Sequence, residues 1–155
     1  MSQSIYEKYG GYPFFHDCIY ALYLDMFDHP EIAYHFIGVD IAKLSHLQAQ
    51  YLTRAIGGPN YYDGRDVKAL HADMKITPFQ FGEIAQAFRG IFLKRGVSPA
   101  DVEIIMHFIL KHKKVIVTAE SSPMDKVMRP VYGFARKYLA KYLPKDSSWL
   151  RKPKK

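Results

Sequence analysis

Residues 57–71, GGPNYYDGRDVKALH, separate a long amphipathic segment upstream from two further ones downstream. The pair Gly57-Gly58 predicts the end of a helix, because glycine enters the left-handed backbone region without a steric penalty. Asp63-Gly64 is a turn signal, and the short segment that follows it ends in a single histidine, His71. The stretch therefore delivers one imidazole on a short element between long helices.

His71 has two interpretations from this stretch alone. It is either a partly exposed histidine that ends a surface turn, or the single proximal ligand that a haem iron needs. His107 and His112 are five residues apart and diverge on a helix, unlike a zinc pair at i and i+4. Three of the other histidines show no metal-ligand spacing either; they are His16, His29 and His35.

Three motifs occur in order along the chain: IYEKYGG at 5–11, GVDIAK at 38–43 and the stretch at 57–71. Together they resemble the truncated haemoglobins of the first group, small globins with a two-over-two arrangement of helices. The resemblance implies a globin domain at 1–118 that holds haem b with one iron bound by His71. It also sets residues 119–155 apart as an extension.

Apolar residues recur with a period near 3.6, which independently predicts an all-α fold. Asp40, Thr77 and Ser98 are expected N-caps, and proline follows the last two at the first helical position. The segment after Ser98 is expected to be one final globin helix. The expected helices span 4–9, 13–28, 31–36, 40–56, 77–96 and 98–116.

The resemblance assigns a distal pocket to Tyr23, Leu44, Leu47 and Gln48. Leu44 and Gln48 are four residues apart and share one side of a helix. The phenol of Tyr23 and the amide of Gln48 can both donate hydrogen bonds to dioxygen. The alternatives are a core tyrosine bonded to a backbone carbonyl and a solvated glutamine.

The resemblance also suggests the remaining contacts with haem. Phe36 matches the phenylalanine that globins place against the haem face. Tyr62, Arg65 and Lys68 are expected near the haem edge, where cations can hold propionates. The expected proximal wall contains Ile76, Phe81 and Ile84.

Three positions depart from relatives in the family. Some relatives carry a second histidine ligand where Leu47 stands here, and His46, one residue earlier, is rotated about 100° away. We therefore expect an open sixth site. His112 lies two residues from the histidine that some relatives link covalently to haem, so no such link is predicted. Leu52 replaces a phenylalanine proposed to gate a gas tunnel.

Charge is concentrated at the end of the chain. The whole chain carries a net charge of +7, whereas residues 121–155 alone carry ten Lys/Arg against two Asp and residues 1–120 are nearly neutral. Apolar spacing from residue 124 to 142 predicts an additional C-terminal helix. This extension either packs on the globin or docks, through residues 123–155, on an anionic membrane or an acidic protein. Nucleic acid is disfavoured, since no binding motif accompanies the charge.

Cys18 is the one cysteine, which excludes an intrachain disulfide framework. No apolar run approaches the length of a membrane span and no signal peptide opens the chain, so we expect a cytoplasmic protein. In one interpretation this protein is peripheral to the inner face of the membrane.

The resemblance implies a haem protein that reversibly binds dioxygen, as well as nitric oxide and carbon monoxide. One expected activity is oxidation of nitric oxide to nitrate. This reaction needs an external reductase, because the chain has no flavin or nicotinamide motif. The alternative is a carrier or sensor of oxygen or nitric oxide whose extension docks elsewhere.

Overall fold

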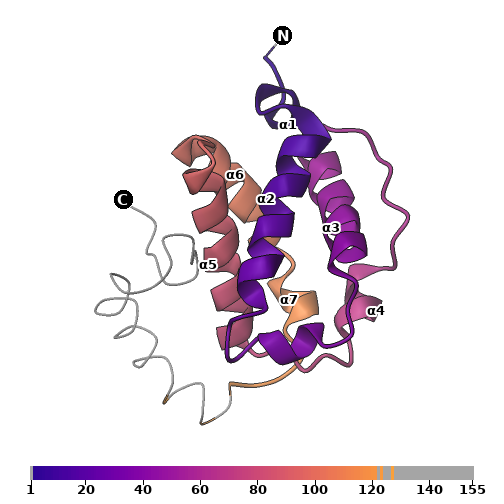
Figure 1. Cartoon of the computed structure of the whole chain (residues 1–155), viewed down its shortest axis with the longest axis vertical. Helices are drawn as coiled ribbons and strands as arrows, with labels where there is room; N and C mark the ends of the chain where they lie inside the picture. The colour runs from indigo at the N-terminus through magenta and orange to yellow at the C-terminus, as the bar shows by residue number, and fades with distance from the viewer. Residues whose placement is uncertain (1, 122, 124–126, 128–155) are drawn as a thin grey trace.

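The computed structural model describes residues 2–121, 123 and 127 (Figure 1). Within this part every regular element is helical, which confirms the all-α prediction. The four long helices are α2 (Gly11–Met26), α3 (Ile41–Ala55), α5 (Pro78–Lys94) and α6 (Pro99–Leu110). The short elements are α1 (Ile5–Lys8), the 3-10 helix η1 (Ala33–Phe36), α4 (Val67–His71) and α7 (Lys113–Ile116).

The long helices form two packed pairs, α2 with α3 and α5 with α6, and α2 also lies against α5 (Figure 1). This is the two-over-two arrangement expected of a truncated globin. The core between the pairs is apolar and largely fully buried, with Phe15, Ile19, Leu22, Phe88, Phe92, Ile105 and Met106 among its members.

The three expected N-caps are confirmed. Asp40 accepts a hydrogen bond from the Lys43 amide at 3.1 Å, and Ser98 accepts one from the Asp101 amide at 3.3 Å. Thr77 forms a capping box with Gln80, in which each side chain bonds the other residue's backbone amide. Each cap satisfies an amide that the first turn of a helix leaves without an intrahelical acceptor.

The prediction of one continuous helix from Ser98 to Ile116 is wrong, because α6 ends at Leu110 and α7 begins at Lys113. In a continuing helix the Phe108 carbonyl would accept from the backbone amide of His112. Here the Nδ1 atom of His112 donates to that carbonyl at 2.8 Å, and the backbone amide of His112 bonds Ile109 instead. The side chain of His112 thus takes the place of a backbone donor in the hydrogen-bond series of the helix, and α6 ends there.

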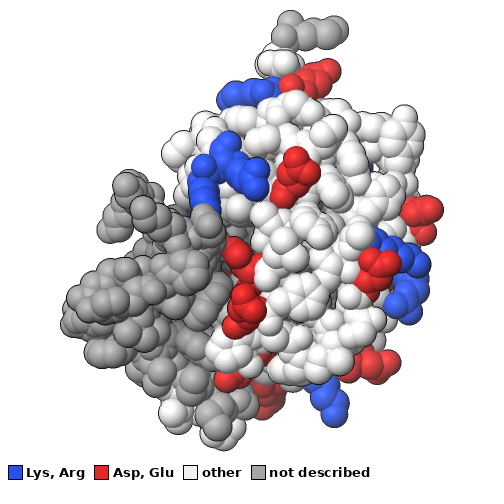
Figure 2. All heavy atoms as spheres, in the orientation of Figure 1, with Lys and Arg blue, Asp and Glu red and all other residues white. Residues whose placement is uncertain are grey.

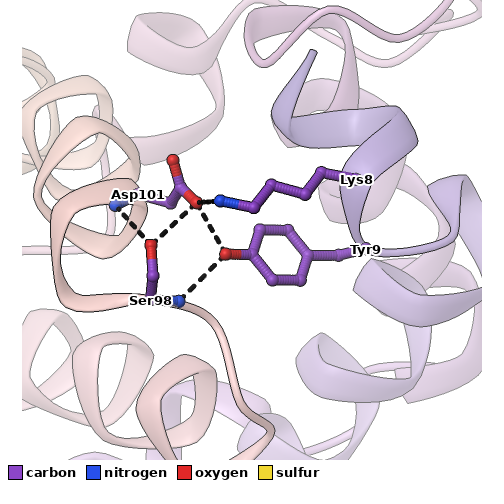
Figure 3. Close-up of polar contacts among 4 residues, drawn as sticks. All are labelled: Lys8, Tyr9, Ser98 and Asp101. Carbon is purple, nitrogen blue, oxygen red and sulfur yellow. Dashed lines mark hydrogen bonds and ion pairs between the residues drawn. The ribbon is translucent and has the colours of Figure 1, made fainter. Parts of the chain in front are cut away.

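A polar cluster fastens the N-terminal helix to the start of α6 (Figure 3). One carboxylate oxygen of Asp101 accepts from Lys8 Nζ at 2.6 Å, the Tyr9 phenol at 2.6 Å and Ser98 Oγ at 2.8 Å. The Tyr9 oxygen in turn accepts from the Ser98 amide at 3.0 Å. These donors hold the pKa of Asp101 at about 2, with the Lys8 ammonium as the largest cause.

Two further features concern the single cysteine and the end of the chain. Cys18 is fully buried, and burial raises the pKa of its thiol to about 11, so it is unreactive at neutral pH. The helix expected from residue 124 to 142 lies outside the described residues. Within residues 2–121, no helix is long and apolar enough to cross a membrane.

Candidate functional site

His71 is the last residue of α4. Asp66 caps this helix by accepting from the Ala69 amide at 3.0 Å. The Nδ1–H of His71 donates to the Val67 carbonyl at 2.7 Å, which leaves the lone pair on Nε2. Burial lowers the pKa of His71, and the hydrogen bond to the Val67 carbonyl offsets only part of this effect. The imidazole is therefore neutral at pH 7, oriented and free at Nε2 to act as a metal ligand.

The chain after α7 returns to the same region. The backbone amides of Thr118 and Ala119 both donate to the carbonyl of Ile76, at 3.0 and 3.1 Å. Helix α7 lies against α4, and Ile76 is buried. The end of the globin segment thus supports the short helix that carries His71.

Tyr23 and Phe36, two residues expected near the haem, pack against each other. Their rings lie edge to face with centroids 5.5 Å apart, and both side chains are buried. Phe27 contributes a second edge contact to Phe36 at 5.9 Å. Burial raises the pKa of Tyr23 well above its usual value, so the phenol stays protonated and remains a hydrogen-bond donor.

Helix α3 carries the remaining residues that were expected in the distal pocket. Leu44, Leu47 and Gln48 are half-buried, whereas Ser45 and Ala49 of the same helix are fully buried. Because α2 packs on α3, the structure brings the helix of Tyr23 next to that of Gln48.

The residues expected at the haem edge and proximal wall differ in burial. Tyr62 donates from its phenol to the Arg65 carbonyl at 2.6 Å, which fixes the loop before α4. Arg65 and Lys68 are exposed, a position from which cations can reach carboxylates at a rim. On α5, Phe81 is buried and Ile84 is half-buried against the core.

His46 is exposed, as expected of a residue rotated away from the pocket. Its Nδ1 atom lies 2.6 Å from the Tyr12 phenol oxygen. A cleft of about 280 Å³ is found here; it is lined by Tyr6, Tyr12, His46, Gln50, Thr53, Pro59 and Tyr61. None of the expected haem contacts lines this cleft.

Sequence reasoning missed the pair formed by Tyr51 and His112. The Tyr51 phenol lies 2.8 Å from His112 Nε2, so this bond joins α3 to the break between α6 and α7. The spacing of Leu44, Gln48 and Tyr51 at i, i+4 and i+7 places Tyr51 on the pocket stripe and could have singled it out. Its partner lies 61 positions away and could not be found from spacing.

On the face shown in Figure 2, both Lys and Arg and Asp and Glu are scattered over the described surface. Among residues 2–121, no group of three or more His, Cys, Asp or Glu side chains could hold a metal ion. The iron ligand expected from the sequence, the single imidazole of His71, does not depend on such a group.

The chain matches a known family over most of its length. Residues 4–118 match the family described as bacterial-like globin. A group 1 truncated haemoglobin of Mycolicibacterium paratuberculosis is 26% identical over 118 residues, which cover 76% of this chain and 87% of that protein. One from Tetrahymena pyriformis is 26% identical over 98 residues, covering 63% of this chain and 81% of that protein.

Solved structures share the fold. The 2/2 haemoglobin of Synechococcus sp. PCC 7002 superposes with a TM-score of 0.69 at 23% identity, covering 74% of this chain and 98% of that one. A group II truncated haemoglobin of Bacillus anthracis gives a TM-score of 0.71 at 21% identity, covering 79% of this chain and 97% of that one.

The site fits a haem on its own chemistry. His71 is a neutral imidazole whose hydrogen bond is made by Nδ1, so Nε2 can bind iron. A buried phenol and apolar side chains are of the kind that enclose a flat apolar group. Haem with one iron is the cofactor, and the fold and the sequence match agree with it. The chain therefore belongs to the bacterial-like globin family, is similar to group 1 truncated haemoglobins, and binds dioxygen through its haem.

Proposed function

We propose that this globin oxidises nitric oxide to nitrate, using dioxygen held in its distal pocket and an external reductase. When bound, haem supplies the reversible binding of dioxygen and its reaction with nitric oxide. The protein must hold the polar dioxygen ligand long enough for nitric oxide to arrive. His71 is the proposed iron ligand, and Tyr23 and Gln48 are the proposed hydrogen-bond donors.

The buried Tyr23 phenol carries this proposal. Its side chain is 7% exposed and burial raises its pKa, so the phenol keeps its proton and can donate a hydrogen bond at every physiological pH. A donor in a dry pocket interacts more strongly with a partly charged ligand than one in water. Phe36 packs edge-on against the Tyr23 ring and restricts its rotation.

A dioxygen carrier or sensor is the second candidate, and the charge of the extension favours it. Residues 121–155 carry a net charge of +8, whereas the globin segment is nearly neutral. An attachment of this kind to an anionic membrane or an acidic protein weakens as salt rises. In this version ligand binding at the haem changes docking of the extension.

The first experiment measures dioxygen dissociation and nitric oxide consumption in Tyr23→Phe. A hydrogen bond to a charged group contributes about 1.5–3 kcal/mol. Loss of the phenol should therefore speed dioxygen dissociation by about ten- to a hundredfold, at about 1.4 kcal/mol per tenfold. Gln48→Leu should have a milder effect, and the double variant should be less than additive.

Carbon monoxide binding is the control, because this less polar ligand should respond weakly to either substitution. If Tyr23→Phe leaves dioxygen dissociation unchanged, the distal assignment fails and a carrier or sensor with an apolar pocket becomes the better function.

A second experiment compares the full chain with a chain ending at Thr118. The shorter chain should give the same oxygenated spectrum, since the globin contacts of Thr118 are retained. Cosedimentation of the full chain alone with anionic vesicles at low salt would favour docking. Loss of haem from the shorter chain would show instead that residues 119–155 belong to the haem domain.

A further inference from the structure

A stripe of exposed apolar side chains runs along α2. Tyr20, Leu24 and Phe27 stand at i, i+4 and i+7 and are 39%, 47% and 37% exposed. This spacing places them on one side of the helix, here called the α2 stripe, whereas Ile19 and Leu22 of the same helix are fully buried in the core. A surface helix normally places polar residues opposite its buried side. The α2 stripe is therefore a surface that another segment can cover.

The chain around the α2 stripe is acidic. Residues 9–42 contain four Asp and one Glu and no Lys or Arg. Asp17 and Asp28 are exposed, and each borders the stripe because it lies three or four residues from Tyr20 or Leu24. A segment that covers the stripe should therefore carry apolar residues on one side and Lys or Arg next to them.

The extension has this complementary pattern in its sequence. From residue 124 to 142 apolar residues recur at alternating spacings of four and three, as in the seam of a coiled coil; they are Met124, Met128, Val131, Ala135, Tyr138 and Tyr142. Residues 121–155 carry a net charge of +8. Val127 lies off this seam and is 62% exposed, and Pro130, also off the seam, is expected to kink the helix.

The extension starts close to the end of α2. The backbone amide of Ala119 donates to the carbonyl of Ile76, just before α5 begins. The first turn of α5 in turn contacts the chain that follows α2, because Gln80 Nε2 donates to the Glu31 carbonyl at 2.9 Å. In Figure 1 the described chain after α7 passes below the lower ends of α2 and α5. The five residues up to position 124 add about 17 Å of reach, so the seam begins near the end of α2.

We propose that the extension docks on the α2 stripe of its own chain. The seam of residues 124–142 covers Tyr20, Leu24 and Phe27, and the Lys and Arg side chains beside it lie next to the acidic residues of 9–42. Because the extension starts at the C-terminal end of α2, it runs antiparallel to that helix. The lengths agree, since the 16 residues of α2 and the 19 of the seam correspond to about 24 and 28 Å of helix.

Docking on α2 has two consequences. The same basic side chains cannot pair with α2 and with an anionic membrane at once, so the globin competes with a membrane for its own extension. Attraction between exposed charges weakens as salt rises, so salt should release the extension. The docking face also adjoins the expected haem pocket, because Phe27 contacts Phe36 at 5.9 Å and Phe36 contacts Tyr23 at 5.5 Å between ring centroids. The inference does not depend on the nitric oxide reaction.

Limited trypsin digestion of the full-length holoprotein at low salt, followed by intact mass, tests the docking. The extension holds cleavage sites at Arg136, Lys137 and Lys141, which docking should protect. Leu24→Glu should speed cleavage there by at least about tenfold, because it puts a charge in the apolar contact and raises the undocked fraction. Ile104→Glu is the matched control, because it replaces another exposed apolar side chain, 57% exposed, on α6. Equal cleavage rates in wild type and Leu24→Glu overturn the proposal.

A pair of charge variants tests the acidic border. Asp28→Lys should also speed cleavage of the extension at low salt, and its effect should fade as salt rises. Asp63→Lys makes the same change of charge at an exposed carboxylate in the loop between α3 and α4, and should leave the rate as in the wild type. If both variants act equally, the attraction is not specific to α2 and the proposal is wrong.

A cross-link decides the matter if Leu24→Glu fails to fold. Leu24→Cys is combined with Met128→Cys and treated with a short bismaleimide, while Cys18 is fully buried and stays unmodified. The yield should exceed that of Ile104→Cys with Met128→Cys, and equal yields overturn the proposal. Protection from trypsin that rises with protein concentration would identify a second copy as the partner. Protection that appears only with phosphatidylserine vesicles would identify a membrane, and either result overturns docking on α2.

Discussion

Replacing Asp101 by Asn should destabilise the protein at neutral pH and have little effect in acid. The three donors around one carboxylate oxygen hold the pKa of Asp101 at about 2, against an ordinary value of 3.8 (Figure 3). At about 1.4 kcal/mol per pKa unit, this difference corresponds to about 2 kcal/mol of folding free energy. The Asp101 side chain is 14% exposed, but Lys8 is 48% exposed, so screening by salt reduces the contribution.

The lowered pKa of Asp101 decides at which pH its carboxylate stabilises the folded protein. A carboxyl whose pKa is lowered on folding stabilises the protein above its unfolded pKa and loses that contribution as pH falls through its folded pKa. Urea unfolding of wild type and Asp101→Asn should therefore differ by up to about 2 kcal/mol at pH 6.5, and the difference should shrink below pH 4.

Glu103→Gln, on the same helix, breaks an exposed ion pair with Arg89 and should cost less. A difference between wild type and Asp101→Asn that is absent at pH 6.5, or unchanged at pH 3, would refute this account. A difference that is unchanged at pH 3 would come from packing and not from the charge of Asp101.

Two further predictions concern the haem ligand and one glycine. His71→Ala should lose haem on gel filtration, measured as the ratio of Soret to protein absorbance, whereas the control His46→Ala should retain it. A ferrous wild-type spectrum that shows two histidine ligands would contradict the prediction of an open sixth site. Gly57→Ala should destabilise the protein by at least about 1–2 kcal/mol in urea unfolding, because Gly57 has φ of 98° and a Cβ there would lie 2.5 Å from the Ser4 side chain. Gly38→Ala has a similar φ of 74° but no atom within 4 Å of the added carbon, so an equal loss in both variants would show that the Ser4 contact costs nothing.

The sequence predicted those features that depend on neighbours along the chain. The caps at Asp40, Thr77 and Ser98 are local, since each side chain bonds an amide three residues later. The left-handed turn at Gly57 is equally local. The positions of Tyr23 and Gln48 needed the family pattern, and their assigned roles stay predictions.

Features made by distant residues were not predictable in the same way. Nothing in the apolar spacing of residues 98–116 signals that His112 will take the Phe108 carbonyl and end α6. The imidazole is held in that position by Tyr51, which approaches from another helix. In the same way, the buried contact between His29 and Glu83 joins residues 54 positions apart.

Helix α4 shows why the haem must be counted among the forces that hold this fold. It has five residues, contains no fully buried side chain, and is far shorter than a helix that is stable alone in water. Its position depends on the Asp66 cap, the packing of α7 and the bond from Tyr62 to the Arg65 carbonyl. A ligand that binds the folded state alone adds its binding free energy to stability. Through the proposed coordination by His71, haem binding would stabilise this short helix, so we expect haem affinity and the order of α4 to rise and fall together.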